Sequence, residues 1–392
     1  MIFDRQILPQ IIQRLNSMPV VALLGPGQVG KTTLAKQIQN IKNPDCIYID
    51  LESSEDLNKL NQAESYLTER SDKLIIIDEI QRMPELFPIL RSVIDKDNRN
   101  GRFLLLGSAS PGFLAKSSES LAGRLSYFEL NPFKYSEVSS QFDFKKLWLR
   151  GGYPKMLLAK NDEISYKNRN DLIKNYTERQ LSLLGLFASP VLLRNLIQML
   201  SHIHGKVLNY SDLSRSLGID IHTVKRYIDY LEYSFLIRRL QPYYVNVSKR
   251  LIKSPKIYFR DSGLFHTITG VKNVEDLEGC YQKGNSWEGF VIQQIIAQLK
   301  PDITPYFYQT QDGAGLDLVL IKGNLPVLGI EIKYSNTPSS TKGNTISSQD
   351  LGNIPVLIIT PSVNEDYLLN NTKVVTSFTN SFGHLKKLEF IY

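Results

Sequence analysis

The sequence predicts an α/β chain in which a parallel sheet comes first, a mainly helical unit second and a mixed helix-and-strand unit last. Short apolar runs alternate with helical stretches up to about residue 130, as strands do when a parallel sheet buries both of their faces. Helical periodicity dominates after the turn Gly151–Pro154, and a β-rich tail follows. A chain of 392 residues is long enough to form two or three cores. We expect units at 1–150, 151–270 and 271–392.

The expected strands of the first unit are short and rich in Val, Ile and Leu. They lie at 20–24, 46–50, 74–78, 103–107 and 126–130. Each is separated from the next by a stretch long enough for a helix or a loop, as parallel pairing requires.

The composition excludes several classes of protein. No apolar run approaches the ~18–20 residues that a membrane span needs, so no membrane contact is expected. Cys46 and Cys280 lie far apart without a CxxC partner, which argues against a disulfide framework or a zinc site and favours a cytoplasmic location. The net charge of +7 is compatible with nucleic-acid binding and is also common in proteins that never contact nucleic acid.

A nucleotide-binding motif follows the first expected strand. The segment Gly25–Thr32 matches G-x-x-x-x-G-K-[ST], and a helix-compatible stretch comes directly after it. Lys31 is expected to pair with the β and γ phosphates, and Thr32 to offer its hydroxyl to magnesium. The sequence therefore predicts ATP and Mg²⁺ as ligands. The nucleotide contacts are expected from Gly25, Pro26, Gly27, Gln28, Val29, Gly30, Lys31, Thr32 and Thr33.

Polar residues at the ends of other strands extend this site. Asp78 is expected to hold magnesium through water, and Glu79 to orient or deprotonate the attacking water. Ser108 follows the next apolar strand and either senses the γ phosphate or forms a turn. Arg124 either reaches a phosphate, in its own subunit or in a neighbouring subunit of an oligomer, or forms a structural salt bridge.

Four segments of the first unit carry a family resemblance, namely Gly25–Thr33, Ile77–Gln81, Leu106–Ser108 and Leu121–Arg124. They resemble the predicted AAA-type ATPases of bacteria and archaea that carry a C-terminal domain of unknown function. The resemblance implies a P-loop NTPase fold and extends over nearly the whole chain. One position departs from the family, which usually has arginine where this sequence has Gly27.

The second unit contains a helix-turn-helix pattern. Residues 208–218 and 221–231 read as two short helices joined by a tight turn, and residues 235–240 as the first strand of a wing. The pattern predicts an α-helical winged-helix domain. On the second helix, Ile221, Val224, Ile228 and Leu231 are expected in the core. The side chains expected to contact nucleic acid are His222, Thr223, Lys225 and Arg226.

Basic residues near the expected wing suit phosphate contacts as well. They are Lys249, Arg250, Lys253 and Lys256. The alternative is that the winged helix serves only for packing or protein contact. The segments Tyr176–Arg179 and Tyr258–Leu264 also resemble the C-terminal region of the family, and the sequence assigns no role to either.

The third unit places two acids and a lysine together. Period two puts Glu331 and Lys333 on one face of a strand, and a short turn brings Asp317 close to the position opposite Glu331. With Glu288 on the preceding helix, this arrangement resembles the PD-(D/E)XK nuclease fold, an α/β fold. The resemblance implies Asp317 and Glu331 as metal ligands and Lys333 as the residue that stabilises developing charge. The alternative is a solvated Glu-x-Lys face, and nuclease-like domains often bind without cutting.

Two functions are consistent with the whole sequence. The first is an ATP-binding protein and Mg-dependent ATPase coupled to a DNA-binding, nuclease-like region. The second is an ATP-dependent regulatory or signalling switch whose C-terminal domains bind protein partners and are catalytically silent.

Overall fold

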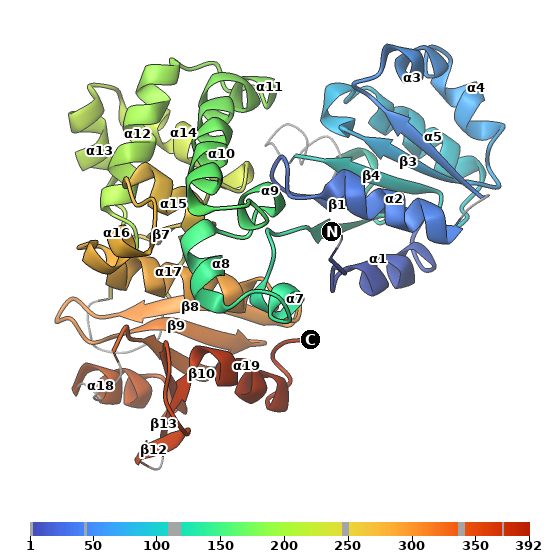
Figure 1. The fold of residues 1–392 in the computed structure, drawn as a ribbon. Helices are drawn as coiled ribbons and strands as arrows, with labels where there is room; N and C mark the ends of the chain where they lie inside the picture. The colour runs from blue at the N-terminus through green and yellow to red at the C-terminus, as the bar shows by residue number, and fades with distance from the viewer. Residues whose placement is uncertain (1–2, 43–44, 109–118, 245–250, 336–341, 371) are drawn as a thin grey trace.

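The computed structural model describes residues 3–42, 45–108, 119–244, 251–335, 342–370 and 372–392. The chain forms two bodies (Figure 1). The first, drawn in blue to teal, contains the sheet of the first unit. The second, drawn from green to red, contains the remaining helices and a second large sheet.

The first body is built on a parallel sheet of five strands in the order β2-β3-β4-β1-β5, which confirms the predicted parallel α/β sheet. The strands are β1 Val20–Leu24, β2 Cys46–Asp50, β3 Leu74–Asp78, β4 Phe103–Gly107 and β5 Leu125–Glu129. The first four lie at the expected residues, and the fifth begins one residue earlier. Strands β1, β3 and β4 are buried on both faces, which explains why each reads as a continuous apolar run.

Helices cover both faces of this sheet (Figure 1). They are α1 Leu8–Leu15, α2 Lys31–Lys42, α3 Ser54–Lys59, α4 Ala63–Thr68 and α5 Leu86–Lys96, with a 3₁₀ turn, η1, at Ile80–Arg82. Alternate residues of β1 enter two different cores, with Ala22 in the core that includes α5 and Leu23 in the core that includes α1 and α2. The helices therefore sandwich the sheet as a doubly covered α/β layer structure requires.

The second body begins with a chain of helices. They are α7 Tyr135–Val138, α8 Phe144–Arg150, α9 Pro154–Leu157, α10 Asp162–Asn175, the π-helical turn η2 Tyr176–Gln180, α11 Leu181–Leu183, α12 Pro190–His202, α13 Tyr210–Leu217 and α14 Ile221–Tyr233. Helices α13 and α14 are joined by a short turn, and Gly218 ends α13 in the left-handed conformation with φ of 66°. Strands β6 Ile237–Leu240 and β7 Lys256–Phe259 pair antiparallel.

One expected core residue of α14 is not in the core. Val224, Ile228 and Leu231 are buried as expected, but the side chain of Ile221 is 37% exposed. The reason is that Asp220 caps the helix through the Thr223 amide, so Ile221 is the first residue of the first turn and projects past the packed face.

The last third of the chain forms a six-stranded mixed sheet in the order β12-β13-β11-β10-β9-β8. Its elements are α15 Ser262–Ile268, α16 Val274–Gly279, α17 Lys283–Ile296, β8 Ile303–Gln309, β9 Gly315–Lys322, β10 Leu325–Ile332, α18 Lys342–Asp350, β11 Val356–Thr360, β12 Tyr367–Asn370, β13 Lys373–Ser377 and α19 Phe378–Lys387. Strand β9 pairs antiparallel with both β8 and β10, whereas β11 pairs parallel with both β10 and β13.

The largest core of the second body joins segments far apart in the sequence. Trp148 on α8 packs edge-to-face on Trp287 of α17, with ring centroids 5.2 Å apart, and its indole N–H donates to Ser286 Oγ at 2.9 Å. Residues 144–150, which the sequence grouped with the ATPase unit, thus pack on the last unit. Among the residues that the structure describes, no helix has both the length and the apolar character needed to cross a membrane.

Candidate functional site

The P-loop joins the end of β1 to the start of α2, at the carboxyl edge of the parallel sheet. Gly25 has no room for a side chain, because a Cβ there would lie 2.6 Å from the carbonyl oxygen of Leu130. Gly30 adopts φ of 103°, a conformation that favours glycine. The glycines therefore let the backbone form the tight loop from which helix α2 starts at Lys31.

Lys31 is buried inside this loop. Its ammonium donates to the carbonyl oxygens of Gly25 at 2.9 Å and Pro26 at 3.1 Å. Burial lowers the pKa of Lys31, while the nearby Glu79 and Asp78 act in the opposite direction. Phosphate oxygens suit this ammonium as acceptors, so the loop fits the nucleotide that the motif predicts.

Asp78 lies at the end of β3 and binds two hydroxyl groups. Thr32 Oγ1 donates to its Oδ2 at 2.8 Å, and the Tyr48 hydroxyl donates to the same oxygen. Burial and the contact with Asp78 raise the pKa of Tyr48. A hydroxyl and a carboxylate in contact are the two protein groups expected to hold magnesium beside a phosphate, so these residues fit the ion. Sequence reasoning missed Tyr48. Only the pairing of β2 with β3 brings its hydroxyl to Asp78.

Glu79 is held by a side chain that sequence reasoning left without a role. Gln81 Nε2 donates to the Glu79 carboxylate, and Gln81 Oε1 accepts the backbone N–H of Ser108 at 3.3 Å. Glu79 itself adopts the left-handed conformation, with φ of 56°. Burial raises the pKa of Glu79, although Lys31 opposes this shift. Gln81 thus links the predicted water-activating acid to the end of β4.

Gly107 makes this link possible. A Cβ at Gly107 would lie 2.4 Å from Gln81 Oε1. Strand β4 pairs with β1, with Gly107 opposite Leu24, so Ser108 lies beside the start of the P-loop. The Ser108 position suits the predicted phosphate sensor, and its backbone N–H is the group in contact with Gln81.

A cavity of about 440 Å³ opens over the P-loop. The second body forms part of its wall through Pro154, Lys155 and Leu158 at helix α9. The other lining residues are Phe3, Arg5, residues 27–34, Gln37, Glu79 and Phe133. A nucleotide on the P-loop would therefore lie within reach of both bodies.

Arg124 lies away from this cavity. It directly precedes β5, and β5 runs parallel to β1, so Arg124 is at the amino edge of the sheet while the P-loop is at the carboxyl edge. Its guanidinium pairs with Asp95 at 2.6 Å. This contact corresponds to the structural salt bridge that the sequence left open, and a contact with the phosphate of a neighbouring subunit stays a prediction.

The segment Tyr258–Leu264, to which the sequence assigned no role, connects the two bodies. Arg260 pairs with Glu129 at the end of β5 and donates to Asn131 Oδ1 at 2.9 Å. The Asp261 carboxylate accepts the backbone N–H of Gly152 at 2.8 Å and caps helix α15 through the Leu264 amide at 2.9 Å.

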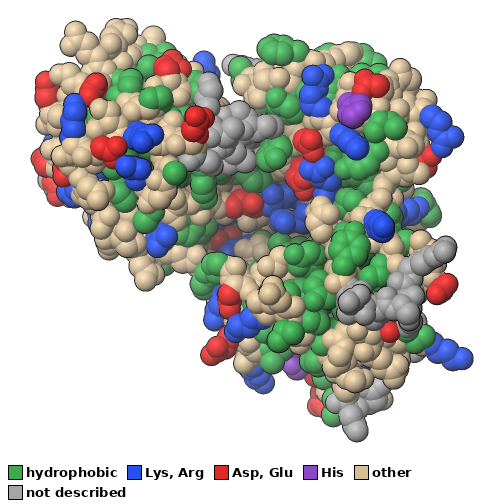
Figure 2. All heavy atoms as spheres, turned by 180° about the vertical axis from the view of Figure 1, so that it is seen from behind, with side chains coloured by type: hydrophobic (Ala, Val, Ile, Leu, Met, Phe, Trp, Pro, Cys, Tyr) green, Lys and Arg blue, Asp and Glu red, His purple; other side chains and the backbone are tan. Residues whose placement is uncertain are grey.

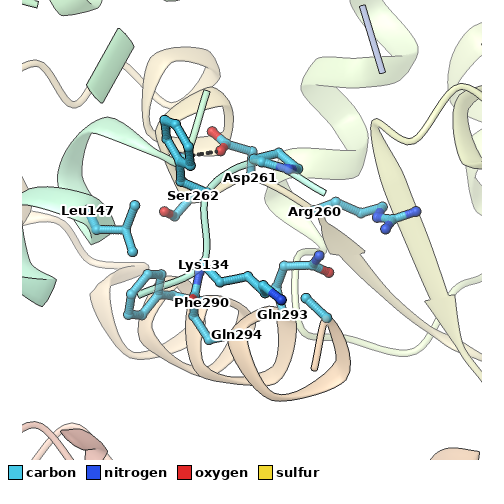
Figure 3. Close-up of a pocket in the computed structure, with 12 residues that line it drawn as sticks. Lys134, Leu147, Arg260, Asp261, Ser262, Phe290, Gln293 and Gln294 are labelled. Atoms are coloured by element: carbon cyan, nitrogen blue, oxygen red, sulfur yellow. Dashed lines mark hydrogen bonds between the residues drawn. The ribbon is translucent and has the colours of Figure 1, made fainter. Parts of the chain in front are cut away.

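Figure 3 shows that the Arg260 and Asp261 side chains extend away from each other, so adjacent residues contact different parts of the molecule. Figure 2 shows acidic and basic side chains gathered in the hollow between the two bodies. The junction between the bodies is therefore held in part by charge pairs as well as by apolar packing.

The predicted acids of the third unit lie together. Leu318 on β9 pairs with Ile330 on β10, which places Asp317 and Glu331 side by side. Lys333 Nζ lies 2.5 Å from Glu331 Oε1, and Asp317 Oδ2 accepts the backbone N–H of Ile332 at 2.9 Å. Asp317, Glu331 and Lys333 all line a cavity of about 370 Å³.

A second lysine enters this cluster from β7. Lys256 Nζ lies 3.4 Å from Glu288 Oε1 on α17 and 3.6 Å from Asp317 Oδ1. The hydroxyl of Tyr258 also donates to Glu288 Oε1, at 2.5 Å. The expectation that Lys256 offers its charge to phosphates near a wing is therefore wrong, because the side chain is buried against carboxylates and only 12% exposed.

The charges of the cluster are mutually dependent. Burial and the Asp317 carboxylate raise the pKa of both Glu288 and Glu331. Burial alone would lower the pKa of Lys256, but Glu288 and Asp317 outweigh it and raise that pKa. The Lys256 ammonium, whose charged form the neighbouring carboxylates favour, therefore opposes the effect of burial on Glu288.

The cluster does not fit a divalent metal as it stands. Within the described parts of the chain, no group of three or more His, Cys, Asp or Glu side chains is placed to hold a metal ion. Asp317 and Glu331 each face a lysine, and Asp317 also accepts a backbone N–H. The pair of metal ligands expected at Asp317 and Glu331 is therefore occupied by donors of the chain itself.

The predicted nucleic-acid contacts lie on the outer face of α14. His222, Lys225 and Arg226 are exposed. Thr223 is partly exposed, and its hydroxyl donates to Asp220 at 2.6 Å as part of the helix cap. Lys253 is exposed, whereas Lys249 and Arg250 lie outside the described residues.

A comparison with known families supports an AAA-type ATPase domain in the first body. The AAA domain family matches residues 17–139. Two families described as domains of unknown function, DUF8612 and DUF4143, match residues 141–275 and 283–380.

The chain also has relatives among known proteins. It is 38% identical over 357 residues to the uncharacterized proteins Rv2008c of Mycobacterium tuberculosis and Mb2031c of Mycobacterium bovis. The match covers 91% of this chain and 80% of each relative. An uncharacterized protein of Haemophilus influenzae is 22% identical over 302 residues, covering 69% of this chain and 74% of its own.

Solved structures give more distant matches. A Walker-type ATPase of Pyrococcus abyssi is 17% identical with a TM-score of 0.48, over 68% of this chain and 96% of that one. A STAND-class signal-transduction ATPase of Pyrococcus horikoshii is 15% identical with a TM-score of 0.32, over 76% of this chain and 45% of that one. Both likenesses are too weak to add to the argument.

Proposed function

The chain belongs to the family of the mycobacterial proteins Rv2008c and Mb2031c and carries an AAA domain, and from this premise we propose that it is a Mg-dependent ATP hydrolase coupled to a DNA-binding, nuclease-like region. The observation that carries the proposal is the contact of Thr32 with Asp78 at 2.8 Å, beside Lys31. A P-loop hydroxyl, a strand-end acid and a buried ammonium in one place are the groups that a nucleotide triphosphate with magnesium requires.

Each residue of this site has a distinct task. Lys31 exchanges its contacts with the Gly25 and Pro26 carbonyls for phosphate oxygens, and the loop amides bind the same phosphates. Thr32 and Asp78 would hold the magnesium, which would supply positive charge to neutralise the phosphates. Glu79 accepts a proton from the attacking water or orients it, and Gln81 fixes the direction of its carboxylate.

Two contacts support coupling between the nucleotide and the second body. Helix α9 contributes Pro154, Lys155 and Leu158 to the wall of the nucleotide cavity. The segment 256–261 contacts the ATPase sheet through Arg260 and the C-terminal cluster through Lys256 and Tyr258. A change in the nucleotide cavity would therefore be transmitted by packed elements with contacts at both ends.

The DNA-binding and nuclease-like roles rest on the arrangement of the second body. The short turn between α13 and α14, together with the β6–β7 pair, supports a winged helix at 151–270, with Lys225 and Arg226 exposed on α14. The acids Glu288, Asp317 and Glu331 with Lys333 support a nuclease-like unit at 271–392. DNA is the proposed partner of both.

A specific observation favours the second function, an ATP-dependent switch whose C-terminal domains bind a protein and cut nothing. The carboxylates that a nuclease would offer to metal are already paired with Lys256 and Lys333. A cluster neutralised by its own lysines is stable without a metal. Under this alternative the outer face of α14 binds a protein partner.

The experiment that tests the proposal is ATP turnover by the purified full chain, with and without duplex DNA. Lys31→Ala and Glu79→Gln should each abolish turnover, and Glu79→Gln should still bind ATP, because only the water-activating acid is changed. Stimulation of the wild-type chain by DNA supports the coupled enzyme. Tight ATP binding with negligible turnover that DNA does not change would contradict it and support the switch.

A further inference from the structure

The C-terminal carboxylate cluster contains a cation that comes from outside the unit to which the cluster belongs. Lys256 lies on β7, which pairs with β6 beside the helix-turn-helix, while Glu288, Asp317 and Glu331 lie on α17, β9 and β10. Its ammonium lies 3.4 Å from Glu288 and 3.6 Å from Asp317. The side chain is 12% exposed, so water does not replace these contacts.

The register of β7 holds the ammonium in place. Successive side chains of a strand point to opposite faces, so Lys256 and Tyr258 face the cluster while Ile257 and Phe259 enter the core of the helical unit. Ile257 and Phe259 are 0% and 2% exposed. Lys256 therefore cannot leave the cluster by a simple rotation of β7 without uncovering two buried apolar side chains.

A divalent ion would need the same oxygens. Magnesium binds one or two carboxylates at close range and is repelled by an ammonium in the same position. Every acid of the cluster already has a donor, since Glu288 binds Lys256 and Tyr258, Asp317 binds Lys256 and the Ile332 amide, and Glu331 binds Lys333.

We propose that Lys256 is the resident cation of the C-terminal cluster and excludes divalent metal from it while β7 stays docked. Metal enters only when the Lys256 ammonium is withdrawn. This rests on the proposed nuclease-like role of the cluster, and it makes β7 the element that keeps the cluster closed. A nuclease-like centre held in this way has no open metal site in the docked arrangement.

The test is a titration of the full-length chain with Mn²⁺ in the absence of nucleotide. The electron paramagnetic resonance signal of the free ion measures how much Mn²⁺ is bound. All proteins carry Asp78→Asn, so that the predicted magnesium site of the P-loop does not contribute. Lys256→Met keeps the length of the side chain and removes the charge. It should gain a site that binds Mn²⁺ at least ~10-fold more tightly than the parent. Lys256→Arg keeps the charge and should bind as weakly as the parent.

Two controls assign the gained site. Adding Asp317→Asn to Lys256→Met should abolish it, because the proposed ligand is lost. The thermal midpoint of each variant is measured beside the titration, and Lys256→Gln replaces Lys256→Met should the latter not fold.

Three outcomes overturn the inference. The first is a folded Lys256→Met variant that gains no Mn²⁺ site. The second is a parent chain that already binds Mn²⁺ as tightly as Lys256→Met, at a site lost in Asp317→Asn. The third is a gain in Lys256→Arg equal to that in Lys256→Met. The titration contains no ATP, so it can succeed or fail independently of the ATP turnover that tests the proposed function.

Discussion

Replacing Gln81 tests whether the link between Glu79 and β4 positions the catalytic acid. Gln81 bonds the Glu79 carboxylate with its Nε2 and the Ser108 backbone N–H with its Oε1. In Gln81→Ala both contacts are lost and Glu79 gains freedom of rotation. We expect the kcat for ATP hydrolysis to fall while the KM for ATP stays within about twofold, because no predicted phosphate or metal contact changes.

The size of the effect follows from the contacts. A hydrogen bond to a charged group contributes ~1.5–3 kcal/mol, and ~1.4 kcal/mol corresponds to a tenfold change in rate. Part of the orientation survives, because the Glu79 backbone N–H still donates to Asp78 Oδ1 at 2.9 Å. We therefore expect the lower end of the range, a fall in kcat of ~10-fold.

Gly107→Ala should reproduce this effect without altering any catalytic side chain. Its new methyl group would lie 2.4 Å from Gln81 Oε1, closer than two such atoms can approach, so the Gln81 side chain must move. Ser108→Ala is the matched control. It keeps the backbone N–H that Gln81 accepts and therefore reports only on the Ser108 hydroxyl.

Steady-state ATP turnover, with thermal melting of each variant, tests whether Gln81 positions the Glu79 carboxylate. Unchanged or increased kcat in Gln81→Ala, with normal folding, would refute the positioning role, and an increase would mean that Gln81 restrains Glu79 instead. A Gly107→Ala variant with wild-type turnover would refute the steric part of the reasoning.

Three further predictions concern the junction and the surface. Gly263→Ala should lower the free energy of unfolding by ~3 kcal/mol in urea titrations, because its Cβ would lie 2.1 Å from the Arg150 carbonyl oxygen, whereas Gly279→Ala, with no atom within 4 Å, should be nearly neutral. Burial disfavours the charged form of Glu129, but the charges of Arg260 and Arg238 and the hydrogen bonds from Arg260 and Asn131 together outweigh burial and lower the Glu129 pKa. The stability that the Glu129 carboxylate contributes is therefore present above its unfolded-state pKa and is lost as the pH falls through the lowered pKa. Glu129→Gln should flatten this acid-side loss, which we expect to be at most ~1 kcal/mol because the Glu129 side chain is 38% exposed. Neutralising Lys225 and Arg226 together should weaken duplex-DNA binding and lower the slope of log K against log salt by ~2, and an unchanged slope would contradict phosphate contact by α14.

The first body could be predicted from sequence because its signals are local. The strands of a covered parallel sheet are continuous apolar runs, and the P-loop motif lies between one of them and a helix. Gln81 lies in one of the segments that carry the family resemblance, but the sequence predicts no role for it, because its contact with Ser108 depends on the pairing of β3 with β4. The same is true of Tyr48, whose hydroxyl reaches Asp78 from the next strand.

Lys256 shows why the second body was harder to predict. In the sequence it is one of several basic residues near an expected wing, where exposed phosphate contacts are the ordinary interpretation. Its partners Glu288 and Asp317 lie 32 and 61 residues further along the chain and approach it only because β7 packs against the last unit. Charge pattern alone cannot tell a cation that faces solvent from one that faces buried carboxylates.

Lys256 belongs to a short segment that contacts both the C-terminal cluster and the ATPase sheet. From Lys256 to Arg260 an extended chain spans ~13 Å. At one end Lys256 neutralises the C-terminal cluster, and at the other Arg260 pairs with Glu129, which lies opposite Leu24 at the end of the strand that leads into the P-loop. Because a strand is stiff along its length, a displacement of the β5 edge would shift the ammonium relative to its carboxylates. Sub-ångström changes at the P-loop edge would then alter a charge pair whose strength depends steeply on distance.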